Sequence, residues 1–365
     1  MKFKRILAML LSIILILNFA SCGKSEDTDT TKKGEATTTE ASKTTESTTE
    51  DVTDGVTTEA ESTDPSHEAK PEDKPQKPDD TTDVTDGISP LLYKVTDAKG
   101  NVVWLFGSIH VGKEYFYPLP DYVMNAYNSS DALAVEFDIT NTDYDMSSLM
   151  SVMMEMAYTD GTKLKDHIPE DIYEDSKAIL KENGMYFPAL DIYYPILWSM
   201  FIDSIITENI GYNSELGIDY FFLNTAHEEN KKIYDVESME FQLGMLAGFS
   251  DDLQLLMLES SIDSYNNIDE YKASLDELAT GWAMGDASAL TEDDYEFESK
   301  KEQMLYEEYN TEMVVKRNIN MADFAEDALK SGEEVFIVVG AAHVVGEGGM
   351  ADLLAERGYT VEVVK

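Results

Sequence analysis

The sequence predicts a mixed α/β (α+β) protein whose sheet is built from N-terminal and C-terminal sections, with a large helical cap inserted between them. Three observations predict this fold. Apolar, β-branched runs typical of strands occur near both ends of the folded part, at 102–111 and 334–339. Between them, residues 146–332 repeat apolar side chains at spacings of three and four, as helices do. Both strand-like runs also carry the same pattern at their ends, a glycine followed three residues later by a histidine.

Residues 1–22 predict an export leader of the lipoprotein type. Three basic residues precede an apolar run, 6–17, which is interrupted only by a serine and is too short to span a bilayer. The Phe-Ala-Ser-Cys that follows resembles the lipobox of bacterial lipoproteins, which implies lipidation of Cys22 and anchoring to the cell membrane on its extracytoplasmic face. The alternative is ordinary secretory cleavage nearby. Because Cys22 is the only cysteine, an intramolecular disulfide and a thiol nucleophile in the folded part are excluded.

Residues 23–87 predict a disordered stalk. The segment consists mainly of Thr, Glu, Asp, Ser, Lys and Pro, has no aromatic residue, and carries nineteen acidic residues against seven lysines. Such a segment cannot bury enough apolar surface to offset its conformational entropy, and repulsion between like charges extends it. We interpret it as a tether that lifts the folded domain off the membrane; the alternative is a plain low-complexity spacer.

The folded part, residues 88–365, is strongly acidic. Removing the −12 of the stalk and the +3 of the leader from the chain's −45 leaves −36 on this part. A surface of this sign repels nucleic acid and anionic lipid headgroups, and both are excluded as partners. The simplest interpretation of the acidity is a solvated surface. The length suffices for one large domain or two modest ones.

The first elements of the folded part are a hairpin, a helix and a strand. Residues 90–111 predict the hairpin, in which LLYKVT and VVWLFGSIHV are joined by a turn at DAKGN. A proline opens a helix over 120–127. Residues 131–138 predict a third strand that ends on Glu136 and Asp138. Polar side chains are therefore expected at the strand ends.

The rest of the chain continues with helices and then returns to alternating helices and strands. The apolar spacing predicts helices over 196–210, 253–265 and 271–284, and one short strand, 232–236, that ends on Glu237. The last section predicts, in order, a helix over 317–329, a strand over 334–339, a helix over 350–357 and a strand over 360–364. If the first and last strands share one sheet, His110 and His343 lie at neighbouring strand ends.

The repeated motif, Gly107-Ser-Ile-His110 and Gly340-Ala-Ala-His343, predicts a two-histidine site. A glycine at a strand end lets the backbone turn sharply or lets a ligand approach closely. Two imidazoles and the carboxylate of Glu136 would supply ligands for a divalent metal and leave positions open for water. Such a metal would activate the water for hydrolysis. The alternative is that both histidines are buried, hydrogen-bonded core residues without a ligand.

Three other histidines serve as internal controls. His67 lies in the stalk, whereas His167 and His227 lie at the edges of predicted helices among charged residues. For these three, a solvated side chain is the simpler interpretation.

Arginine is rare in this chain, with three against twenty-four lysines. Arg317 lies at the start of the helix predicted over 317–329. Its planar fork suits the orientation of a carboxylate, or the binding of a substrate carboxylate or oxyanion, better than lysine does. The alternative is that its position is a matter of chance.

Taken in order, these motifs resemble the TraB/GumN family, which is related to the Tiki proteases. The resemblance runs from about residue 90 to the end and rests on the two G-x-x-H motifs, Glu136 in LAVEFD, the stretch LGIDYFF (216–222), KKIYDVES with the following Gln242, and the Arg317-Asn318 pair. It implies an α/β core with a divalent-metal site. It also implies a link to peptides, since Tiki proteins are membrane-tethered, metal-dependent peptidases and other members are linked to shutting down secreted peptide signals.

The resemblance assigns roles to individual residues. His110, His343 and Glu136 match the metal or catalytic set. Four more residues match further polar positions of the family or its motifs: Asp219, Glu237, Gln242 and Arg317. The second motif continues as His343-Val-Val-Gly rather than the commoner His-Leu-Val-Gly, a departure that keeps the apolar step.

The sequence therefore leads to a functional hypothesis and a rival. The hypothesis is a membrane-tethered, extracytoplasmic hydrolase that acts on a peptide or protein substrate with a divalent metal ion of unassigned identity. Glu237 would be a second carboxylate for proton transfer, and Arg317 would orient a carboxylate or the oxyanion. The rival is a non-catalytic surface lipoprotein that sequesters a peptide signal in a groove between cap and core. A third interpretation, an envelope scaffold, makes the histidines dispensable.

Overall fold

The computed structural model describes residues 87–141, 146–291 and 297–364. The predicted leader, the predicted lipidation site at Cys22 and nearly all of the predicted stalk lie outside the described residues, and those predictions stay untested. None of the helices in the described part of the chain has the length and apolarity that crossing a bilayer requires.

The described residues form a six-stranded sheet in the order β4-β3-β5-β2-β1-β6. Its strands are β1 (Leu92–Thr96), β2 (Val102–Ser108), β3 (Ala132–Val135), β4 (Lys232–Asp235), β5 (Val335–Gly340) and β6 (Thr360–Val364). The strands β4, β3, β5 and β2 are parallel to one another, whereas β1 is antiparallel to both β2 and β6. The C-terminal strand β5 thus lies between two N-terminal strands, which confirms a sheet shared by both ends of the chain.

The sheet is buried on both faces because its inner strands alternate between two cores. Along β5, Phe336 and Val338 pack into one core, whereas Val335, Ile337 and Val339 pack into the other. Near-continuous apolar strands of this kind are typical of parallel sheets covered by helices on both sides. Successive side chains of a strand point to opposite faces of the sheet. Because both faces are buried here, the run contains no polar side chain.

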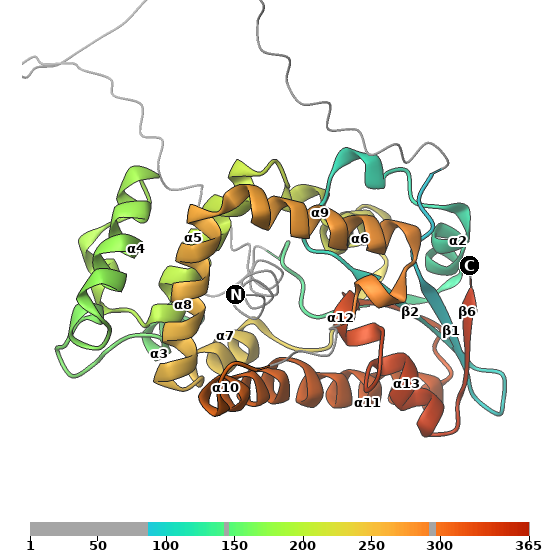
Figure 1. Ribbon diagram of the computed structural model, residues 1–365. Helices are drawn as coiled ribbons and strands as arrows, with labels where there is room; N and C mark the ends of the chain where they lie inside the picture. Colours follow the sequence, from blue (N-terminus) through green and yellow to red (C-terminus); the bar gives the residue numbers. More distant parts are fainter. Residues whose placement is uncertain (1–86, 142–145, 292–296, 365) are drawn as a thin grey trace, which may run out of the picture. The chain divides into compact units, whose positions relative to one another are not determined.

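Helices cover the sheet and extend beyond it (Figure 1). Apolar side chains of α11 (Lys316–Ser331) and α13 (Met350–Glu356) cover one face. The core on the other face includes side chains from α2 (Asp121–Ser129), α6 (Ile218–Glu229) and α9 (Ile268–Met284). The remaining long helices are α3 (Met146–Glu155), α4 (Glu170–Glu182), α5 (Pro195–Asn209), α7 (Met239–Ala247), α8 (Asp251–Asn266) and α10 (Lys300–Asn310).

Short helical turns connect these elements. They are η2 (Glu114–Phe116), η3 (Leu164–Asp166), η4 (Pro188–Ile192), η5 (Ser214–Leu216), η6 (Ala287–Ala289) and α12 (Ala341–Val344), together with a π-helical turn, η7 (Thr311–Val315), between α10 and α11. The mixed α/β fold with a large helical section is therefore confirmed. The strand predicted over 131–138 is shorter in the structure than expected. It spans Ala132–Val135, and Glu136 therefore lies just beyond its end.

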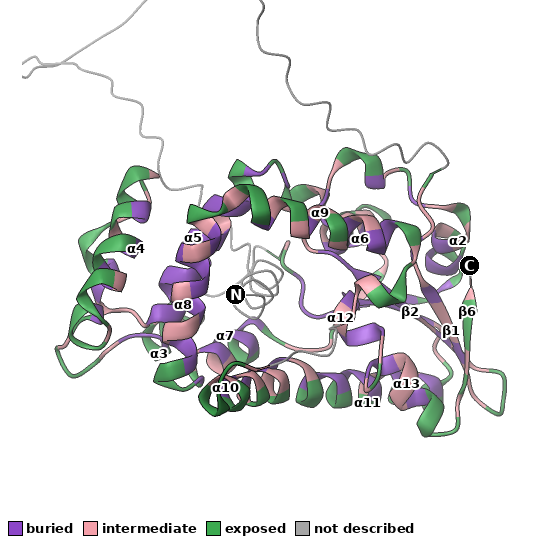
Figure 2. Cartoon of the chain, in the orientation of Figure 1, coloured by how far each residue is buried: buried purple, intermediate pink, exposed green. Residues whose placement is uncertain are grey.

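The helices α5 and α8 pack on each other away from β1 and β6, and their buried faces meet in Figure 2. Twelve of the fifteen residues of α5 are buried, as expected for a helix that is apolar on most sides. One of the twelve is ionisable: Asp203 is 3% exposed. Burial raises the pKa of Asp203 to about 8, an effect that the hydroxyl of Ser261 on α8 partly offsets.

Replacing Asp203 should change how stability depends on pH. Because the folded-state pKa lies above the ordinary 3.8, the fold favours the protonated acid. This stabilisation is complete below about pH 4 and is lost as the pH rises through about 8, at a cost on the order of a few kcal/mol. The Asp203→Asn variant should therefore lose less thermal stability than the wild type between pH 5 and pH 9. Asp327→Asn, at a side chain 80% exposed, is the control and should follow the wild type. A wild-type slope in Asp203→Asn would contradict the assignment.

Candidate functional site

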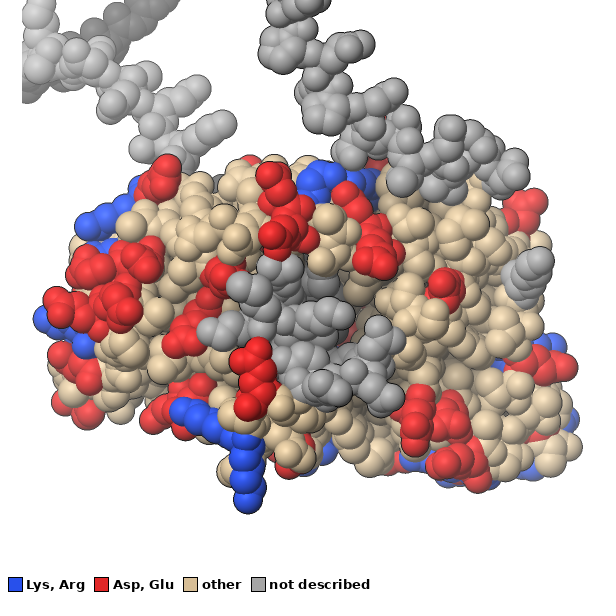
Figure 3. Space-filling view, in the orientation of Figure 1, with Lys and Arg blue, Asp and Glu red and all other residues tan. Residues whose placement is uncertain are grey.

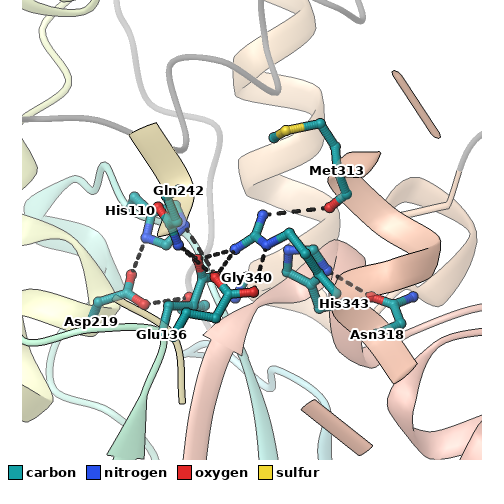
Figure 4. A network of polar contacts seen from close by, with 11 residues as sticks. His110, Glu136, Asp219, Gln242, Met313, Asn318, Gly340 and His343 are labelled. Atoms are coloured by element: carbon teal, nitrogen blue, oxygen red, sulfur yellow. Dashed lines mark hydrogen bonds and ion pairs between the residues drawn. The ribbon is translucent and has the colours of Figure 1, made fainter. Parts of the chain in front are cut away.

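The two G-x-x-H motifs lie side by side at the carboxyl ends of β2 and β5. These strands are parallel neighbours, and Ser108 pairs with Gly340 at their ends. Ends of adjacent parallel strands meet at one edge of a sheet, where α/β proteins commonly bind ligands. His110 and His343 therefore come together, as the shared sheet predicts. Figure 4 shows both side chains with Glu136, which follows the neighbouring strand β3.

Gly107 and Gly340 have different reasons to be glycine. A Cβ on Gly107 would lie 2.8 Å from the Cα of Ala341, so this glycine lets α12 pack closely on β2. The Gly107 carbonyl also accepts a hydrogen bond from the buried Trp282 indole of α9, at 2.8 Å. A Cβ on Gly340 would instead lie among side chains, 3.3 Å from Glu136 Oε1 and 3.6 Å from His110 Nε2. Gly107 is therefore a packing residue, whereas Gly340 leaves space at the centre of the site.

The buried guanidinium of Arg317 contacts two carboxylates, those of Glu136 and Glu237. Arg317 is 1% exposed; its Nη2 donates to Glu136 Oε2 at 2.5 Å. Its Nε and Nη2 donate to the two oxygens of Glu237, both at 2.8 Å. The Gln242 amide donates to Oε2 of both glutamates, also at 2.8 Å. Of the two roles predicted for Arg317, the contacts fit the orientation of carboxylates.

This pairing keeps Glu136 ionised. Burial by itself would raise the pKa of Glu136, but Arg317 above all, then His110 and His343, hold it well below its usual range. Glu136 Oε1 also accepts the Gly340 N–H at 2.9 Å. Both carboxylate oxygens are thus already engaged, and Glu136 is a weak base.

Glu237 occupies a different place from the one expected for proton transfer. Its side chain is 3% exposed and its contacts are to Arg317 and Gln242, and it does not line the cavity beside the histidines. Within the described residues it is therefore a support for Arg317.

His110 is held by Asp219. The Nδ1 atom lies 2.6 Å from Asp219 Oδ2, while Oδ1 accepts from the Ser108 hydroxyl at 2.7 Å. Asp219 is the second residue of α6, and the helix start is tied to the motif because the Ile218 N–H donates to the Ile109 carbonyl at 3.0 Å. Burial, the largest single influence, would lower the pKa of His110, but the carboxylates of Asp219 and Glu136 act against it and the pKa is raised. The imidazole keeps 17% exposure, so solvent reaches it.

His343 is held in a neutral form. Its Nδ1 lies 2.7 Å from Asn318 Oδ1, and the Asn318 amide nitrogen donates to the Gly348 carbonyl at 2.8 Å. Because that amide nitrogen must face a carbonyl, Oδ1 faces the imidazole and accepts the Nδ1 proton. Burial and the charge of Arg317 lower the pKa of His343 to about 3. The ring therefore carries a lone pair on Nε2 at neutral pH.

A cavity of about 70 Å³ adjoins these groups. His110, Glu136, Arg317 and His343 line its polar side. The other side is formed by apolar residues of α9, α10, the π-helical turn and the segment after η6: Leu278, Leu290, Tyr309, Met313 and Val314.

The histidine pair fits a metal better than the full predicted set does. Among the described residues, neither Nε2 atom makes a hydrogen bond, and each Nδ1 is held by a carboxylate or an amide, as in metal-binding histidines. Glu136, however, is engaged by Arg317, Gln242 and the Gly340 N–H. No group of three or more His, Cys, Asp or Glu side chains within the described ranges is arranged to hold a metal ion. Metal ligation by His110, His343 and Glu136 stays a prediction.

The remaining described histidines lie elsewhere. His167 stacks on Tyr158 and contacts the Thr162 hydroxyl, and the 50% exposed His227 contacts Asp138. Their distance from the cavity matches their use as controls; His67 lies outside the described residues.

Sequence reasoning gave no role to several residues that shape the site. Ser108 appears only within the first motif, and Asn318 only as the neighbour of Arg317 in the family resemblance. Trp282 and Met313 carry no such signal, because an apolar residue in a helix is normally a core residue.

Comparison with known proteins supports the same relationship. A model of the TraB/PrgY/gumN family matches residues 91–363. YbaP of Escherichia coli K12 is 27% identical over 252 residues, which cover 68% of this chain and 86% of YbaP. Metalloprotease TIKI2 of Xenopus tropicalis is 23% identical over 304 residues, covering 71% of this chain and 57% of TIKI2. Human metalloprotease TIKI1 is 22% identical over 302 residues, covering 71% and 59%.

The match to the Tiki proteins is partial, since the chain spans little more than half of their length. No solved structure matches the chain. The family model, in contrast, extends from β1 into β6 and includes both G-x-x-H motifs, Glu136 and Arg317. The resemblance drawn from the motifs is confirmed: the chain belongs to the TraB/PrgY/gumN family.

Proposed function

We propose that this protein is a membrane-tethered, extracytoplasmic hydrolase that acts on peptides and uses a divalent metal ion. The observation that carries the proposal is the convergence of His110 Nε2, Glu136 Oε1 and the His343 ring around the empty side of Gly340. Two relatives that carry the name metalloprotease, TIKI2 and TIKI1, support the reaction class. The predicted leader supports the location.

In the proposed mechanism, each residue of the site has a defined task. Asp219 orients His110. Asn318 accepts the Nδ1 proton of His343 and so leaves Nε2 free, while burial and Arg317 keep the ring neutral. Glu136 Oε1 lies 3.9 Å from His110 Nε2, and Glu136 would accept a proton from a water held beside the two histidines. Arg317 and Glu237 hold Glu136 in place.

A divalent metal ion would supply what the protein groups of this site lack, an acidified water. Because Arg317 holds the pKa of Glu136 below its usual range, Glu136 takes a proton only from an acidified water. A divalent ion held by His110 and His343 would supply that acidification and would polarise the substrate carbonyl. Within the site, Glu136, Asp219 and Glu237 also outnumber Arg317 in charge, which favours a bound cation.

Replacing either histidine by alanine should abolish peptide cleavage and metal binding together. The reason is that each imidazole would contribute one of two nitrogen ligands. Elemental analysis of the purified protein and cleavage of a peptide library measure the two properties on the same samples. His227→Ala and His167→Ala are matched controls outside the cavity and should behave as wild type. Full peptide cleavage by either His110→Ala or His343→Ala would contradict the proposed site.

The two motif glycines should separate function from stability. Gly340 has an ordinary backbone conformation, φ −48° and ψ 137°, so Gly340→Ala adds a methyl group among the site side chains without backbone strain. It should lower cleavage at least tenfold and leave the melting temperature nearly unchanged. Gly107→Ala should instead lower stability by about 1–3 kcal/mol, since its Cβ meets backbone. Equal thermal shifts in the two variants, measured by calorimetry, would contradict this division.

The membrane anchor has its own test. Replacing Cys22 by alanine should move the protein from the membrane fraction to the soluble extracytoplasmic fraction after cell fractionation, since no other cysteine can carry the lipid. A Ser25→Ala variant, three residues away, is the control. Retention of Cys22→Ala in the membrane would contradict lipid anchoring at this residue.

The rival function, a surface lipoprotein that binds a peptide without cutting it, is favoured by the apolar side of the cavity. It would be supported by protein that binds peptides, holds no divalent ion at neutral pH and cleaves nothing in the library.

A further inference from the structure

The apolar side of the cavity faces the histidines across the same space. Leu278, Leu290 and Val314 are half-buried, as residues that line an accessible cleft are, whereas Met313, which also lines it, is 2% exposed. Among the described lining residues, the charged side chains are those of the polar side, and Glu136 and Arg317 there pair with each other. A charged group placed against the apolar side would therefore lose water without gaining a partner.

The π-helical turn η7 connects this apolar side to the polar site. Turns of this kind are rare and occur often at functional sites. The Met313 carbonyl accepts from Arg317 Nη1 at 3.4 Å, so the turn that supplies Met313 and Val314 also contacts the buried arginine. The next residue, Val315, is 44% exposed and does not line the cavity. Two adjacent valines of one turn thus differ in their relation to the site.

The size of the cavity limits what it accepts. About 10–15 Å³ of such volume holds one water-sized group, so about 70 Å³ holds roughly five. The side chains of Leu, Ile and Met have four non-hydrogen atoms each, whereas Trp has ten. Because the polar side borders the same volume, the apolar side has room for at most one medium-sized apolar side chain.

We propose that this wall, formed by Leu278, Leu290, Met313 and Val314, is a specificity subsite for a medium-sized apolar side chain of the peptide, next to the bond at His110. The inference rests on the proposed peptide hydrolase and names its substrate class: peptides with Leu, Ile or Met at that position. Because the wall and the histidines border one cavity, a side chain held against the wall would place a neighbouring peptide bond near the histidines.

The test uses the full chain and synthetic decapeptides of Gly and Ala that differ at one central position, carrying Leu, Ala, Phe or Asp. The wild type should cleave the Leu peptide with a kcat/KM at least tenfold above the Asp peptide. Val314→Phe should shift the preference from Leu toward Ala by about tenfold, because it fills the subsite, and Val314→Ala should shift it toward Phe. Val315→Phe, in the same turn but exposed, is the matched control and should leave the ratio unchanged.

The outcomes separate the subsite from the reaction. Equal kcat/KM for the Leu and Asp peptides would overturn the subsite but not the proposed hydrolase activity. The same order of kcat/KM values across the four peptides in Val314→Phe and Val315→Phe would have the same consequence. If nothing is cleaved, calorimetry with the same decapeptides decides. Tighter binding of the Leu peptide, lost in Val314→Phe but not in Val315→Phe, would support the subsite while the proposed reaction fails. Equal binding of all four peptides would overturn the subsite.

Discussion

The buried ion-pair cluster of Arg317, Glu136 and Glu237 is the interaction on which the rest of the site depends. Glu136 follows β3, Glu237 follows β4 and Arg317 lies in the first turn of α11. At least 80 positions separate each of the three from the next along the chain. Removing charges from water is costly, and removing one partner leaves the others buried and unpaired. The cluster can therefore form only when these three elements are placed together, and it holds the glutamate that borders both histidines.

The position of β5 is the second constraint. A C-terminal strand that enters between β2 and β3 brings the second G-x-x-H motif beside the first and beside Glu136. The close approach of α12 to β2 requires Gly107 to lack a side chain. The two copies of the motif therefore use their glycines differently. Gly107 makes room for the backbone of α12, whereas Gly340 makes room among the side chains of the site.

The helical section is more than a cover over this edge. It supplies Asp219 from α6, which holds His110, and the Trp282 indole from α9, which holds the end of β2. It also supplies the π-helical turn that lies against Arg317. On the face of the molecule in Figure 3, acidic side chains are spread over the surface rather than gathered in one patch. The buried charge pairing, in contrast, is concentrated beside the cavity, where Arg317 contacts Glu136 and Glu237.

The sequence by itself determined the fold class, the order of the strands and helices, and the identity of most residues that meet at the site. Apolar periodicity marks β2, β5 and the long helices because burial selects it locally, and the repeated motif and the rarity of arginine mark His110, His343 and Arg317. Only the tertiary structure decided their roles. Arg317 orients carboxylates and Glu237 supports it, because both are buried against each other. His110 and His343 differ in pKa because Asp219 raises that of His110, whereas burial and the charge of Arg317 lower that of His343. Such differences arise from contacts between residues far apart in the chain, and no local pattern encodes them.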